Sequence, residues 1–92
     1  LLPVASIERF EIEGVFDDYL TINSRRNLAA DDVILSAEVS SDLAAWNSGV
    51  GFTVFVREIS TGDGNSMVTW RSANPIKTEM REFLRMVATS RP

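Results

Sequence analysis

The chain has 92 residues, of which 45% are hydrophobic and 24% are charged, and its formal net charge at pH 7 is −4. These values are typical of one soluble globular domain and argue against disorder. Histidine and cysteine are both absent, which excludes a Ser-His-Asp triad, a thiolate nucleophile, a disulfide and a zinc-thiolate site. The acidic balance argues against nucleic acid as a partner, because clustered Lys and Arg supply most of that affinity.

The apolar runs and the first residues give expectations about membrane insertion and processing. No apolar run approaches the roughly 18 residues of a membrane helix, so we expect no membrane span. Leu1-Leu2-Pro3 is neither an initiator Met nor the start of a signal peptide, which has a charged and then an apolar segment. We therefore expect residues 1–92 to be a single domain, and a fragment or processed product of a longer protein.

Short stretches in which apolar and polar residues alternate occur along the whole chain. They are rich in β-forming residues and are bounded by turn residues, which predicts antiparallel strands. We expect six strands, over residues 7–12, 19–24, 33–40, 52–60, 66–72 and 82–88. Gly14 ends the first strand, and residues 16–18 form a turn-like break before the second. In the last strand we expect Arg85 to point outward and three side chains to be buried: Leu84, Met86 and Ala88.

The stretch after the third strand predicts a helical turn. The hydroxyl of Ser40 or Ser41 can accept from a backbone N–H two or three residues later, as an N-cap does. Leu43 and Trp46 are three residues apart, so a helical turn places both on one side. We expect one α or 3₁₀ turn over residues 41–46 that buries Leu43 and Trp46. Trp46→Ala should then lower the free energy of unfolding by ~3–5 kcal/mol.

Residues 61–65 predict a hairpin whose register is ambiguous by one residue, and that slip exchanges the two faces of the sheet. The pairing that we favour puts four residues on the core face: Val54, Val56, Val68 and Trp70. It leaves three residues on the other face as a candidate interaction patch: Phe55, Ile59 and Met67. A tighter turn at Asp63-Gly64 would instead group Phe55, Ile59, Val68 and Trp70.

Six short strands without a long helical period predict an all-β fold. We expect a small antiparallel β-sandwich, either immunoglobulin- or fibronectin-like or jelly-roll-like.

Three motifs in fixed order resemble those of a known family. They are Ala37-Glu38-Val39-Ser40-Ser41-Asp42-Leu43 followed by Trp46, then Gly62-Asp63-Gly64, then Arg81-Glu82-Phe83-Leu84-Arg85. This order is similar to V-E-V-S-x-D-L-x-x-W … G-D-G … R-F-L-R-L, a C-terminal module of large secreted proteins from planctomycete- and verrucomicrobia-type bacteria. The resemblance implies a terminal β-sandwich on an extracellular or surface-anchored protein, and it brings no catalytic residues.

Carboxylates are the only residues here suited to catalysis. A glycosidase needs two carboxyls roughly 5–10 Å apart across a cleft, which a sandwich this small rarely encloses. We therefore interpret the acidic pairs as solvated turn residues and expect no enzyme: Glu11/Glu13, Asp17/Asp18 and Asp31/Asp32. We expect no cofactor, with calcium as an alternative at the 61–65 loop or beside Asp31 or Asp32. That loop has one Asp, whereas calcium sites need several oxygen ligands.

Sugar binding is a second open possibility, because exposed aromatic faces stack on pyranose rings. The candidate ligand-binding residues are Trp46, Trp70, Arg57 and Arg71. The alternative interpretation is structural, with both tryptophans in the core and the arginines stacked on Trp70.

Two functions follow as hypotheses. The first is a non-catalytic structural or interaction module of a multidomain secreted or surface protein, whose partners are neighbouring domains or a second copy. The alternative is a carbohydrate-binding module.

Overall fold

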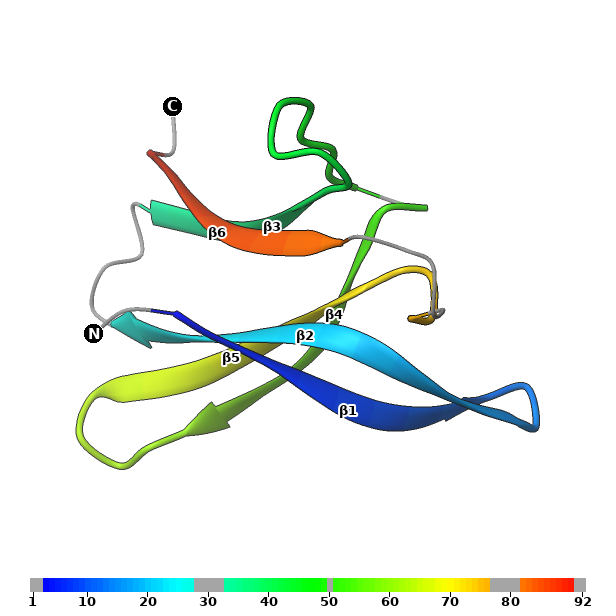
Figure 1. Cartoon of the computed structure of the whole chain (residues 1–92). Coiled ribbons are helices and arrows are strands. Elements are labelled where there is room, and N and C mark those ends of the chain that lie inside the picture. The colour runs from blue at the N-terminus through cyan, green and yellow to red at the C-terminus, as the bar shows by residue number, and fades with distance from the viewer. Residues whose placement is uncertain (1–2, 28–32, 50, 77–81, 91–92) are drawn as a thin grey trace.

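The computed structural model describes residues 3–27, 33–49, 51–76 and 82–90 and contains no helix in these ranges (Figure 1). The described residues form six strands: β1 (Val4–Ile12), β2 (Val15–Asn27), β3 (Val33–Ser40), β4 (Thr53–Ser60), β5 (Asn65–Ser72) and β6 (Phe83–Ser90).

The strands form two antiparallel sheets. One has four strands in the order β1-β2-β5-β4, and the other has only β3 and β6. In Figure 1 the β3–β6 pair lies as a separate layer above the larger sheet. The predicted all-β antiparallel sandwich is confirmed.

The first hairpin is longer than its sequence suggests. Glu13 and Gly14 have φ values of 53° and 81°, the two positive values of a two-residue turn whose twist matches that of the strands. The chain therefore reverses at these two residues, and β2 runs without interruption from Val15. The predicted break at residues 16–18 is wrong, because these residues pair with β1, where Asp18 lies opposite Arg9.

The two sheets differ in width, and this difference determines where the core lies. Strands lie about 4.8 Å apart, so a two-stranded sheet covers only part of a four-stranded one. β6 contacts β2, and β3 contacts β5 and β4. On the covered central strands, Ile22 of β2 is 4% exposed and Val68 of β5 is 3% exposed. On the outer strands, Ile7 of β1 is 63% exposed and Phe55 of β4 is 49% exposed.

The hairpin of β4 and β5 changes register within β4. Near the turn Ile59 lies opposite Met67, as in the pairing that we favoured. A register shift between Phe55 and Arg57 then places Phe55 opposite Trp70, with their ring centroids 5.5 Å apart. A bulge adds one residue to one strand and so exchanges the faces beyond it.

The shift divides the predicted groups of residues. We call the face of the larger sheet that packs against β3 and β6 the inner face, and the opposite one the outer face. Ile59 and Met67 stay together on the outer face, whereas Phe55 lies on the inner face, so the three do not form one patch. Val54, which we expected in the core, lies opposite Arg71 and therefore on the outer face, so its predicted place is wrong.

The stretch after β3 is a loop and not a helical turn. Ser40 Oγ accepts from the N–H groups of Asp42 (3.2 Å) and Leu43 (2.9 Å), as predicted for a cap. Asn47 then pairs back with Val39 through two backbone hydrogen bonds of 2.8 and 2.9 Å, which closes the segment into a loop. Leu43 has a positive φ of 65° and is 60% exposed, so its predicted burial is wrong. Trp46 is half-buried.

The last strand follows its predicted pattern in part. Leu84 and Met86 are half-buried and Arg85 is exposed, but Ala88 is exposed as well. Ala88 lies near the end of β6, which has β3 alone as its neighbour in the sheet.

Because the smaller sheet covers only the central strands of the larger one, the same substitution should lower the free energy of unfolding by different amounts on neighbouring strands. Ile22→Val should lower the free energy of unfolding by about 1 kcal/mol, because it removes a buried methylene. The matched variant Ile7→Val, on the same face of β1, should change it by less than about 0.5 kcal/mol. Urea denaturation measures both values, and equal losses would contradict the proposed limits of the core.

Candidate functional site

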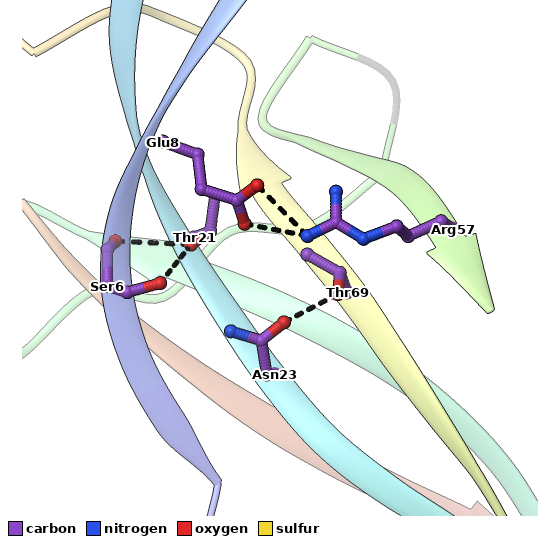
Figure 2. Close-up of polar contacts among 6 residues, drawn as sticks. All are labelled: Ser6, Glu8, Thr21, Asn23, Arg57 and Thr69. Carbon is purple, nitrogen blue, oxygen red and sulfur yellow. Dashed lines mark hydrogen bonds and ion pairs between the residues drawn. The ribbon is translucent and has the colours of Figure 1, made fainter. Parts of the chain in front are cut away.

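The outer face of the four-stranded sheet carries three pairs of polar side chains, each joined across strands. Figure 2 shows these side chains, which we call the polar face: Ser6 and Glu8 of β1, Thr21 and Asn23 of β2, Thr69 of β5 and Arg57 of β4. The cross-strand register puts Ser6 opposite Thr21, and Asn23 opposite Thr69. The polar face therefore spans all four strands of this sheet.

Two hydroxyls at the centre of the polar face, those of Thr21 and Thr69, are buried and hydrogen-bonded. The Ser6 and Thr21 hydroxyl oxygens are 2.8 Å apart, and the Thr21 hydroxyl also lies 3.2 Å from the Ser6 carbonyl oxygen. Thr69 Oγ1 donates to Asn23 Oδ1 at 2.5 Å. Thr21 is 0% exposed and Thr69 is 2% exposed, so these bonds satisfy groups that water does not reach.

One ion pair crosses the polar face from edge to edge. Arg57 Nη2 of β4 donates to both carboxylate oxygens of Glu8 of β1, at 2.9 and 3.0 Å. β1 and β4 are the two outer strands of the sheet, roughly 14 Å apart at the usual strand spacing. The two long side chains therefore extend over the central strands. We call this contact the cross-sheet ion pair, and it explains how an outer face without a second layer has buried hydroxyls.

An aromatic cluster adjoins the polar face. The Arg71 guanidinium lies 4.6 Å from the ring centroid of Tyr19 and 5.8 Å from that of Phe10. The two rings meet edge to face at 5.8 Å, and Tyr19 is only 6% exposed. Arg71 therefore stacks on Tyr19 and not on Trp70, and Arg57 pairs with Glu8, so the predicted stacking of both arginines on Trp70 is wrong.

The inner layer has a groove lined by side chains of β2, β3, β4 and β5. It has a volume of about 160 Å³ and is lined by Arg26, Ile34, Leu35, Phe55, Glu58, Val68 and Trp70. Arg26 Nη1 lies 2.7 Å from Glu58 Oε2, which also accepts from the Ser66 hydroxyl. The Ser66 hydroxyl, and then Arg26, lower the pKa of Glu58. Small-molecule pockets usually have roughly 300–1,000 Å³, so this groove suits a single side chain better than a sugar ring.

The two tryptophans lie in different places. Trp46 is covered by the guanidinium of Arg85 at 4.1 Å from its ring centroid, and Arg85 Nη2 lies 2.7 Å from Glu38 Oε1. Trp70 lines the groove and packs edge to face with Phe55. The structure therefore does not bring the candidate ligand-binding residues Trp46, Trp70, Arg57 and Arg71 together in one site.

The 61–65 loop uses its carboxylate internally. Asp63 Oδ1 accepts from the Thr61 hydroxyl and, at 3.2 Å, from the Asn65 N–H. The Thr61 hydroxyl is the main reason that the pKa of Asp63 is lowered. Within the described part of the chain, no group of three or more Asp or Glu residues is placed to hold a metal ion. Asp31 and Asp32 lie outside the described residues.

Sequence reasoning did not find the polar face. A signal was present, because Ser6 and Glu8, and likewise Thr21 and Asn23, alternate with apolar residues. Glu8 and Arg57, however, are 49 positions apart, and only the strand order brings them together.

No family model, curated protein or solved structure that we compared with this chain gives a significant match. The resemblance to the C-terminal bacterial module therefore stays a prediction. Among the residues that the structure describes, none belongs to a helix long and apolar enough to cross a membrane.

The loop after β3 predicts an acid-sensitive contact. Asp42 Oδ1 accepts from the N–H groups of Ala45 (3.0 Å) and Ala44 (2.8 Å) and from the Ser40 hydroxyl (3.1 Å), which lower the pKa of Asp42 below 3.8. Because the folded pKa is lowered, the contact stabilises the loop at pH values above the unfolded pKa, and its contribution disappears as the pH falls through the folded value. A carboxyl NMR titration should show this lowered pKa, and Ser40→Ala should raise it. An unchanged pKa in that variant would contradict the assigned contact.

The cross-sheet ion pair predicts a measurable coupling. A double-mutant cycle with Glu8→Gln and Arg57→Gln should give about 1 kcal/mol, the upper end for partly exposed pairs. The matched pair Arg9–Asp18 joins adjacent strands, and its side chains are 63% and 48% exposed. Its cycle should give less than about 0.3 kcal/mol. If the two couplings were equal, the cross-sheet ion pair would have no special role.

Proposed function

We propose that the chain is a non-catalytic interaction module that docks through the uncovered margins of its inner face. The observation that carries the proposal is the exposure of large apolar side chains on the outer strands of the larger sheet. Ile7 on β1 is 63% exposed and Phe55 on β4 is 49% exposed, although both belong to the face that forms the core. Ile34 of β3, 46% exposed, lies with Phe55 in the lining of the groove.

The position of these side chains supports docking more strongly than their number does. Single exposed apolar residues are normal on protein surfaces. Here they continue the hydrophobic layer of the sandwich outward, so a neighbouring surface that covered them would extend an existing core. The partners that we propose are neighbouring domains of a longer secreted or surface protein, or a second copy of the chain. The extracellular location rests on the family resemblance alone.

The structure gives less support to the alternative, a carbohydrate-binding module. Sugar platforms present exposed aromatic faces. Tyr19 is buried under Arg71, and Trp46 carries the Arg85 guanidinium. Trp70 packs against Phe55.

Sedimentation and thermal melting test the proposal. The isolated chain should self-associate with rising concentration, or its melting temperature should rise by several degrees when it is joined to the next domain of its parent protein. Ile7→Thr and Phe55→Thr should weaken either effect. The control Val15→Thr changes a residue that is 58% exposed at the tip of the first hairpin and should leave both unchanged.

A strictly monomeric chain with no stabilisation by its neighbours would contradict the proposal. Binding on a glycan array that is lost in Trp46→Ala would support the alternative.

A further inference from the structure

The sandwich has four edge strands, and three of them are protected against pairing with another chain. β1 and β4 are the edges of the larger sheet, and β3 and β6 those of the smaller. Charged side chains and bulges are the usual protection for such edges. β1 carries Glu8, Arg9 and Glu11, and β4 has the register shift between Phe55 and Arg57.

The outer edge of β3 is occupied in part by its own chain. Asn47 exchanges two backbone hydrogen bonds with Val39, and the Thr53 hydroxyl donates to the Ala37 carbonyl at 3.2 Å. β6 has no comparable protection among the described residues. It carries a single charged side chain, Arg85, whereas β1 carries three.

The backbone of β6 directs hydrogen-bonding groups outward that no described residue pairs with. Val39 directs its N–H and C=O towards Asn47, away from β6, so Val39 and Leu84 form a non-hydrogen-bonded pair. Leu84 therefore points its own N–H and C=O away from β3. The same alternation applies to Met86 and Ala88, and no described backbone group bonds to them on that side.

The space beside β6 lies above uncovered apolar surface. β6 contacts β2, so the next strand position in the smaller sheet lies over β1. There Ile7 is 63% exposed on the inner face, opposite the half-buried Leu20. A single added strand would both pair with β6 and cover Ile7.

We propose that β6 accepts an extended peptide strand that completes the smaller sheet; this rests on the proposed function and assigns a linker or tail segment to the uncovered margin at Ile7. The strand has apolar side chains at alternate positions, because every second residue faces Ile7 and Leu20. Opposite Arg85 it carries a neutral or acidic residue, since a cation there would be repelled. Backbone hydrogen bonds supply affinity and the apolar contacts supply specificity, as in other cases of strand addition.

The occupant is a peptide segment and not a second copy of this sandwich. A copy that presented its own β6 would bring its four-stranded sheet into the space that β1 occupies. A contact along one strand of eight residues also falls well short of the roughly 1,200 Å² that stable globular interfaces bury. A linker or tail brings no second sheet, so it does not clash with β1. It also need not bury the area that a stable contact between two globular domains requires.

Amide hydrogen exchange with a designed probe tests the proposal. The probe is a nine-residue peptide of alternating valine and threonine with one glutamate, and a peptide of the same composition in scrambled order is the control. With the probe at about 1 mM, the amides of Leu84, Met86 and Ala88 should exchange at least tenfold more slowly. The amides of Arg85 and Val87, which already face β3, should not change, and the Ile7 methyl resonances should shift.

Two proline variants distinguish binding at the β6 edge from binding at the β3 edge of the smaller sheet. Met86→Pro removes an outward N–H without breaking the ladder with β3, and binding should weaken at least tenfold. Leu35→Pro removes an outward N–H on the β3 edge and should leave binding unchanged. If either variant fails to fold, exchange in the unaltered chain decides by itself.

Protection that is confined to β3 or β4, that is absent, or that the scrambled peptide produces equally would overturn the strand proposal. Sedimentation of the Phe55→Thr variant keeps the two proposals distinguishable. If docking still depends on Phe55 while β6 gains no protection, only the strand proposal fails.

Discussion

The difference in width between the two sheets is the constraint on which the rest of the structure depends. Two strands cannot cover four, so the core is limited to the central strands, where Ile22 and Val68 are buried. This leaves a small hydrophobic core for a chain of 92 residues, in which marginal stability is expected. The margins of the inner face remain apolar and open, and they are the part of the molecule most suited to a partner.

The outer face of the larger sheet has the opposite problem, because no strand of the described residues forms a second layer over it. There the chain uses long charged side chains as cover: the cross-sheet ion pair lies over buried hydroxyls, and Arg71 lies over Tyr19. Buried hydroxyls without partners cost roughly 1–3 kcal/mol each, so the hydrogen bonds of Thr21 and Thr69 are needed wherever this cover excludes water. The polar face is therefore understood first as a structural layer.

Sequence reasoning identified the elements and missed several of their relations. The third strand was predicted with its observed bounds, residues 33–40, because its alternation is unbroken and a Ser-Ser-Asp stretch ends it. The bulge in β4 could not be predicted, since nothing in Phe55-Val56-Arg57 distinguishes a bulged strand from a regular one, yet it decides which face Phe55 joins. Leu43 was misplaced because the Asn47–Val39 pairing, which prevents a helical turn, is a tertiary contact.

The connectivity of the smaller sheet bears on the order in which the chain folds. β1–β2 and β4–β5 are hairpins, whose contacts close short loops, whereas the pairing of β3 with β6 joins residues as distant as Val33 and Ser90. Closing a longer loop costs more entropy before any contact compensates for it. The hairpins are therefore expected to form early and the β3–β6 layer late. Until that layer closes, Ile22 and Val68 face water, so a nascent chain is most open to misassociation at the step that completes its core.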